Sequence, residues 1–124
     1  MTGSISLESL SYQTDRYLEK IEISRIIHCQ ATALARMILN YSGNFEITYS
    51  SLICGDKDSE LSTWLRFSYL DTIHFLVTIL GDPTKKRFNI VALKNGYDVN
   101  NFDIRTDNID DAFNAIIKCA EGKL

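Results

Sequence analysis

The sequence predicts one α+β domain: a long N-terminal helix, an antiparallel meander of four to five strands, and a C-terminal helix packed on the sheet. Apolar residues follow a helical period near both ends of the chain, over residues 14–41 and 109–120. The segments between them alternate with a period of two, and hairpin-length links leave no room for parallel crossovers. A chain of 124 residues fits a single domain, 1–124, in which we expect residues 1–10 to be loosely ordered.

The first helix combines a narrow polar stripe with a wide apolar arc. The polar residues are spaced alternately by three and four, which places them on one face: Glu22, Arg25, Cys29, Thr32, Arg36 and Asn40. A helix that lies on a single sheet needs an apolar stripe only ~100° wide. We therefore expect further cover for this arc from a second helix, a curling sheet or another subunit. Gly43 is well placed to end the helix.

The middle of the chain favours strands. "FEITYSSLI" at 45–53 alternates, "RFNIVAL" at 87–93 is apolar and β-branched, and a short strand is expected near 102–105. Asn-Gly in "KNGY" suits the type I′ turn of a hairpin.

Residues 61–80 fit two descriptions. Ser59 could cap a helix there, and "LGDP" at 80–83 could end it. Against a helix, the segment is rich in β-branched and aromatic residues and keeps one two-residue phase. We expect two strands joined by a tight turn near Leu70–Asp71.

The last helix has the clearest pattern. Its apolar residues fall at spacings of three and four: Ile109, Ala112, Phe113, Ile116, Ile117 and Ala120. Asp107 can cap its start, Asp110 suits the positive end of the helix dipole, and Gly122 can end it.

Bulk properties exclude several classes of function. A formal charge of −3 and a pI near 5.3 argue against general nucleic-acid binding, which needs a basic face. No apolar run approaches the ~20 residues that span a bilayer, and "MTGSISLESL" lacks the features of a signal peptide. The odd, widely spaced Cys29, Cys54 and Cys119 suit reduced thiols, so we expect a cytoplasmic protein.

The sequence offers no motif for a cofactor, a metal or a catalytic constellation. It has no phosphate-binding glycine loop, nucleophile elbow or H-E-x-x-H helix. "DKDSE" at 56–60 imitates the start of a calcium loop, but Leu61 and Phe67 stand where the loop needs glycine and glutamate. We expect no cofactor and no metal, and we favour a protein that is not an enzyme.

Our leading hypothesis is a small protein-binding module that uses the apolar helix surface and an acidic segment near the C-terminus. Five aspartates in that segment are the candidate contacts for another protein, which could be basic: Asp98, Asp103, Asp107, Asp110 and Asp111. The spare apolar surface of the first helix also predicts a homodimer. Immunity proteins and secretion chaperones have a comparable order of elements, which is an analogy of fold alone.

The alternative hypothesis is a small-molecule site or small enzyme with a pocket between the long helix and a curved sheet. Trp64 would supply a flat platform, and Arg66, Tyr69 and His74 would supply polar contacts. His74 interrupts the most apolar run of the chain, and it lies either on the solvent face of the sheet or in this pocket.

Overall fold

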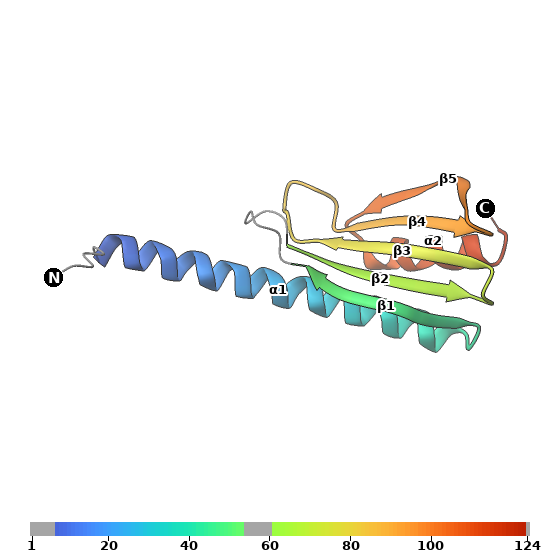
Figure 1. Ribbon diagram of the computed structural model, residues 1–124, viewed down its shortest axis with the longest axis horizontal. Coiled ribbons are helices and arrows are strands. Elements are labelled where there is room, and N and C mark those ends of the chain that lie inside the picture. Colours follow the sequence, from blue (N-terminus) through green and yellow to red (C-terminus); the bar gives the residue numbers. More distant parts are fainter. Residues whose placement is uncertain (1–6, 54–60, 124) are drawn as a thin grey trace.

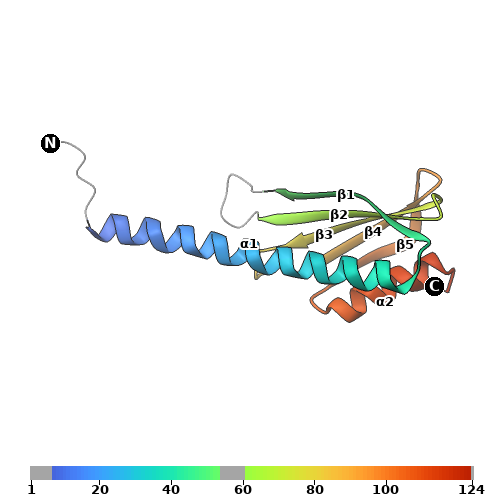
Figure 2. The ribbon, with the colours of Figure 1, turned by 90° about the horizontal axis from the view of Figure 1, so that it is seen from below.

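A computed structural model describes residues 7–53 and 61–123 and confirms the α+β architecture. Helix α1 (Leu7–Tyr41) precedes the sheet and helix α2 (Ile109–Ala120) follows it. The strands are β1 (Phe45–Ile53), β2 (Ser62–Tyr69), β3 (Ile73–Leu80), β4 (Phe88–Lys94) and β5 (Tyr97–Thr106). They form one antiparallel meander in chain order, β1-β2-β3-β4-β5 (Figure 1). Both helices lie on the same face of this sheet (Figure 2).

Two tight turns set the register of the central strands. Leu70 and Asp71 have φ values of 51° and 56°, and the Thr72 N–H donates to the Tyr69 carbonyl at 3.1 Å. Asn95 and Gly96 have φ values of 54° and 84° between β4 and β5. Two successive positive φ values define a type I′ turn, whose twist matches that of the flanking strands. Both predicted turns are confirmed, and residues 61–80 are two strands rather than a helix.

The core fills the space between the sheet and the helices. Strand pairing brings Phe67, Phe75 and Ala92 into one cross-strand row, and all three side chains are buried. Helix α1 packs on β1, β2 and β3 through four buried residues at helical spacings: Ile27, Ala31, Leu34 and Ile38. Helix α2 packs on β4 and β5 and also contacts α1. The sheet and α2 therefore bury much of the wide apolar surface of α1, for which the sequence predicted further cover.

The ends of the two helices are joined by a single tyrosine. The Tyr41 ring packs edge-on against Phe113 with ring centroids 5.7 Å apart, and its hydroxyl donates to Glu121 Oε2 at 3.0 Å. This hydrogen bond to a carboxylate raises the pKa of Tyr41 above its ordinary value. These two contacts fix the C-terminal end of α1 against α2.

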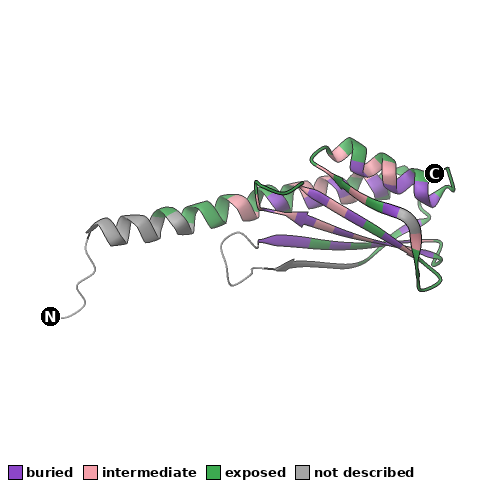
Figure 3. Cartoon of the chain, turned by 90° about the horizontal axis from the view of Figure 1, so that it is seen from above, coloured by how far each residue is buried: buried purple, intermediate pink, exposed green. Residues whose placement is uncertain are grey.

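Helix α1 begins earlier than the sequence pattern predicts and projects beyond the sheet (Figure 1). It starts at Leu7 rather than near Thr14, so residues 7–10, which we expected to be loosely ordered, form its first turn. A helix of 35 residues is about 52 Å long, whereas the eight residues of β2 span about 27 Å. The described side chains on the projecting part are exposed (Figure 3), among them Leu18 at 55% and Ile21 at 40%.

One detail of α2 differs from the prediction. The residue that caps α2 is Asn108, whose Oδ1 accepts hydrogen bonds from the N–H groups of Asp110 at 2.8 Å and Asp111 at 3.1 Å. Asp107 is not the cap, because its carboxylate accepts the Arg87 N–H at 2.8 Å instead. Gly122 follows the helix with φ 70° and ends it as expected.

We predict that Gly81→Ala destabilises the domain. A Cβ on Gly81 would lie 2.5 Å from Ile23 Cγ2 and 3.0 Å from the Leu61 carbonyl oxygen, so α1 would have to shift where it leaves the sheet. Overpacking of this kind costs about 1–3 kcal/mol in the free energy of unfolding. Urea denaturation measures the loss, and Gly43→Ala is the matched control because a Cβ there meets nothing within 4 Å. Equal stability of the two variants would show that α1 does not approach the sheet this closely.

We predict that Leu70→Asn stabilises the domain. Leu70 is 56% exposed and holds a left-handed conformation, which costs an ordinary L-residue roughly 1–2 kcal/mol. Asparagine tolerates this conformation better, so we expect a gain of about 0.5–1 kcal/mol in the free energy of unfolding. Leu70→Ala removes the same exposed apolar surface without relieving the backbone and should give no gain. A loss of stability in Leu70→Asn would contradict the assigned turn.

Candidate functional site

The face of the sheet opposite the helices is covered by none of the elements in the described part of the chain (Figure 1). Strand pairing arranges its residues in cross-strand rows. The first row is Trp64, Thr78, Asn89 and Arg105, and the second is Arg66, Leu76, Val91 and Asp103. This open face therefore carries apolar side chains and charges of both signs within two neighbouring rows.

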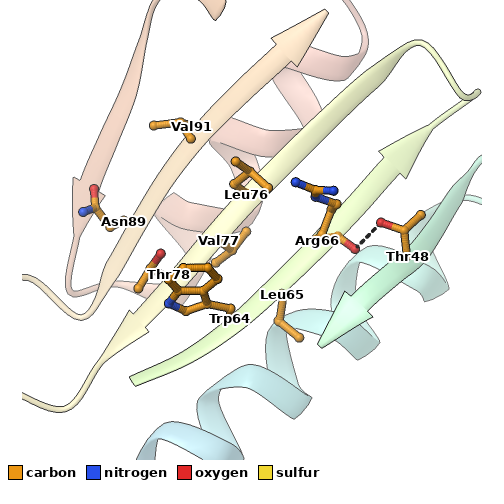
Figure 4. Close-up of a pocket in the computed structure, with 9 residues that line it drawn as sticks. All are labelled: Thr48, Trp64, Leu65, Arg66, Leu76, Val77, Thr78, Asn89 and Val91. Atoms are coloured by element: carbon orange, nitrogen blue, oxygen red, sulfur yellow. Dashed lines mark hydrogen bonds between the residues drawn. The ribbon is translucent and has the colours of Figure 1, made fainter. Parts of the chain in front are cut away.

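A hollow of about 550 Å³ lies at the centre of the open face (Figure 4). Three strands contribute two side chains each: Trp64 and Arg66 from β2, Leu76 and Thr78 from β3, Asn89 and Val91 from β4. Its volume falls in the range of about 300–1,000 Å³ that is typical of small-molecule sites. The only charged side chain among its lining residues is a cation.

Two polar groups among the lining residues of the hollow have no partner in the described part of the chain. The Arg66 guanidinium is exposed and makes no ion pair or hydrogen bond, although the Arg66 carbonyl accepts the Thr48 hydroxyl at 3.3 Å. The Asn89 Oδ1 is buried and accepts no hydrogen bond. Trp64 is 47% exposed, which is unusual for so large an apolar ring. The hollow thus combines a flat apolar surface with an exposed cation and, at its edge, a buried acceptor that has no donor among the described residues.

The structure brings together two of the four predicted pocket residues. Trp64 and Arg66 lie side by side in the hollow. His74 occupies the same face one row further along, half-buried opposite Ser68, and does not line the hollow. Tyr69 lies on the other face, where its ring centroid is 4.7 Å from that of Phe45.

The pocket also lies on the opposite side of the sheet from the side we expected. On the helical side of the sheet, buried core side chains of α1 and of the strands pack against one another. The sequence did not single out Asn89 and Val91 as site residues, because they join Trp64 only through the register across β2, β3 and β4. The turn at Leu70–Asp71 carries part of that register, but β4 is reached through the irregular link at 81–87.

The five candidate aspartates do not form one compact patch. Asp98 and Asp107 lie at or beyond opposite ends of the ten-residue β5, which is about 30 Å long. Asp103 pairs with Arg105 at 3.5 Å, and the carboxylate of Asp107 contacts Lys86 Nζ at 3.4 Å. Asp98, Asp110 and Asp111 are exposed, and no cation in the described residues pairs with them. These residues line one edge of the domain and are partly neutralised.

Other reactive groups are dispersed. Over residues 7–53 and 61–123, no three His, Cys, Asp or Glu side chains gather as metal ligands. Cys29 is exposed and Cys119 is buried, and burial raises the pKa of the Cys119 thiol. Cys54 and the "DKDSE" segment lie outside the described residues.

No helix within the described ranges has both the length and the apolarity to cross a membrane. Comparison of the chain with protein-family models, with curated proteins and with solved structures found no significant match.

We predict that Asp107 supports the fold in a pH-dependent way. The hydrogen bond from the Arg87 N–H, together with Lys86, lowers the pKa of Asp107 below its ordinary value. Its contribution to stability is therefore present above the unfolded pKa of about 3.9 and disappears as the pH falls through the lower folded value. Asp107→Ala should be less stable than the parent chain at pH 7, and the difference should vanish at low pH.

Urea denaturation between pH 7 and pH 2.5 tests this prediction. Asp98→Ala is the control, because Asp98 has the same charge and makes no hydrogen bond or ion pair in the described structure. A pH-independent effect of Asp107→Ala would mean that the carboxylate does not hold the start of β4.

Proposed function

We propose that this chain is a small non-enzymatic protein-binding module, comparable to adaptors, immunity proteins or secretion chaperones, and that it dimerises through the projecting part of α1. The observation that carries the proposal is the length of α1 relative to the sheet. The helix continues for about 24 Å, residues 7–22, before Ile23 meets the end of β3 at Gly81. Leu18 and Ile21 on this extension are exposed.

The described side chains of the extension, among them Leu18, Glu19 and Ile21, are exposed. Isolated helices of about 12–15 residues are marginal in water, and most helices in proteins depend on packing of an apolar face. Within residues 7–22 the sequence has apolar residues at 7, 10, 17, 18 and 21, the spacing of a stripe on one side of a helix. A partner that packs on this stripe would bury several of its apolar side chains and so stabilise the helix.

A second copy of the chain is the partner that best fits the charges beside this stripe. Exposed residues of both signs follow one another along this part of α1: Glu19, Lys20 and Glu22 lie on the extension, and Arg25 lies just beyond it. Two identical segments can therefore pair with acids near bases, whereas a strongly basic or acidic partner would meet like charges. Edge charges of this mixed kind accompany helix–helix seams in coiled coils.

The acidic edge has a secondary part in the proposal. Asp103 and Asp107 already have cations beside them, so contact with a basic protein would depend on Asp98, Asp110 and Asp111. Exposed carboxylates of this kind speed association with a basic partner at low salt and add little affinity.

We also propose that the module works in the cytoplasm. Cys29 and Cys119 are free thiols, and Cys29 is exposed on α1. An exposed, unpaired cysteine is typical of a reducing compartment, because an oxidising one favours disulfides.

Light scattering over a dilution series tests the dimer. We expect a mass of twice 14.1 kDa at high concentration for the parent chain. Leu18→Glu places a charge in the proposed helix seam, so it should raise the dimer dissociation constant by tenfold or more, since a tenfold change needs only about 1.4 kcal/mol.

Leu39→Glu is the matched control. Leu39 is 41% exposed on the same helix but lies on the half that the sheet covers, so this variant should dimerise like the parent chain. A parent chain that stays monomeric at high concentration, or a Leu18→Glu variant that dimerises normally, would overturn pairing through α1.

A further inference from the structure

We propose that the hollow on the open face of the sheet binds a planar aromatic carboxylate, with the ring against Trp64 and the carboxylate on Arg66. This site is separate from the α1 seam, since it lies on the opposite face of the sheet from both helices (Figure 2). The ligand would be a small molecule with two fused or linked rings and one anionic group.

The shape of the hollow supports a flat apolar ligand. The Trp64 ring, 47% exposed, lies beside Thr78, and the apolar side chains of Leu76 and Val91 follow in the next cross-strand row (Figure 4). Aromatic rings stack on such surfaces in offset or edge-on geometry. A bound ring would remove the exposed tryptophan surface from water.

The charge of the hollow selects an anion. Arg66 is the charged residue in the lining, and no carboxylate from residues 7–53 or 61–123 neutralises it. Asp103 is in the same cross-strand row but is two strands from Leu76 and pairs with Arg105. A guanidinium matches a carboxylate through two parallel hydrogen bonds, which gives the ligand one orientation.

The far side of the hollow sets the ligand's length. Asn89 lies on β4, two strands from Arg66, which is a distance of about 10 Å across the sheet. Its buried Oδ1 accepts no hydrogen bond within the described structure, and a buried acceptor without a donor is costly. A ligand that carries an N–H or O–H group at the end opposite its carboxylate would satisfy this oxygen.

The test uses the single tryptophan of the chain, whose indole N–H gives one unambiguous NMR signal. The ¹⁵N-labelled full chain is titrated with 2-naphthoate, with neutral 2-naphthalenemethanol and with cationic 2-naphthylmethylammonium. We expect a saturable shift of the Trp64 indole signal with naphthoate, about tenfold weaker binding of the alcohol, and no saturable shift with the amine.

Two variants assign the charge and the position. Arg66→Gln should lower the affinity for naphthoate by about tenfold and leave the affinity for the alcohol unchanged, since a charged hydrogen bond is lost. His74→Ala is the control on the same face outside the hollow and should bind naphthoate like the parent chain. Both side chains are outside the core, and a retained spectrum confirms that each variant is folded.

Three results would overturn the inference. Absence of a saturable shift with naphthoate would exclude the site, and equal affinity for naphthoate and the alcohol would exclude anion recognition by Arg66. A Trp64 signal that moves on dilution without any ligand would show that a second copy of the chain occupies the hollow. The first two results do not bear on the light-scattering mass. The third is separated from pairing through α1 by Leu18→Glu, because association through the hollow would persist in that variant.

Discussion

The two-residue alternation of the meander is the constraint on which the rest of this structure depends. Strand β3 buries one set of side chains under the helices and presents the other set on the open face, as its alternating burial shows. A slip of one residue between any two strands would exchange these sets. Burial of Phe67, Phe75 and Phe88 holds the register from one side, and the turns at 70–71 and 95–96 hold it from the ends. The two rows that form the hollow are therefore a direct consequence of how the core is packed.

Helix α1 depends on the same sheet for only part of its length. From Ile27 to Ile38 its buried residues share the core with β1, β2 and β3. Before Ile23 in the sequence, the helix runs beyond the sheet. Gly81 packs against Ile23 at the edge of the sheet, where only a residue without a Cβ fits. The two parts of α1 are therefore stabilised differently. Tertiary packing stabilises the part on the sheet, whereas the extension depends on helix propensity and on any partner that it binds in solution.

The sequence predicted well those features that depend on local chemistry. Alternation and Asn-Gly predicted the strands and one turn, and helical spacing predicted α2 almost to the residue. The start of α1 was missed because residues 7–13 lack the continuous apolar arc of the later helix. Asn108 and Asp107 can both cap a helix, and the choice between them follows from the Arg87 N–H of another strand, which local sequence does not reveal.

Prediction of the candidate site required contacts between residues that are far apart in the sequence. Trp64 and Arg66 were identified because they are two residues apart on one strand, whereas Asn89 and Val91 approach them only across two further strand pairings. Tyr69 was assigned to the pocket from its chemical type, although its odd phase, shared with Leu65 and Phe67, places it on the core side. The odd or even position of a residue along a strand predicted its face of the sheet better than its chemical type did, because successive side chains of a pleated strand point to opposite faces.

The two uncovered surfaces are mechanically independent. The α1 extension leaves the domain on the helical side of the sheet (Figure 2), and the residues that line the hollow lie on the other side. A dimer built on the extension would therefore leave Trp64 and Arg66 accessible in each copy. What connects the two surfaces is β2 and β3, whose buried residues support α1 and whose alternate residues line the hollow. Any coupling between dimerisation and ligand binding would require small movements of β2 and β3. These strands are paired on both sides and packed on one face, so they resist movement.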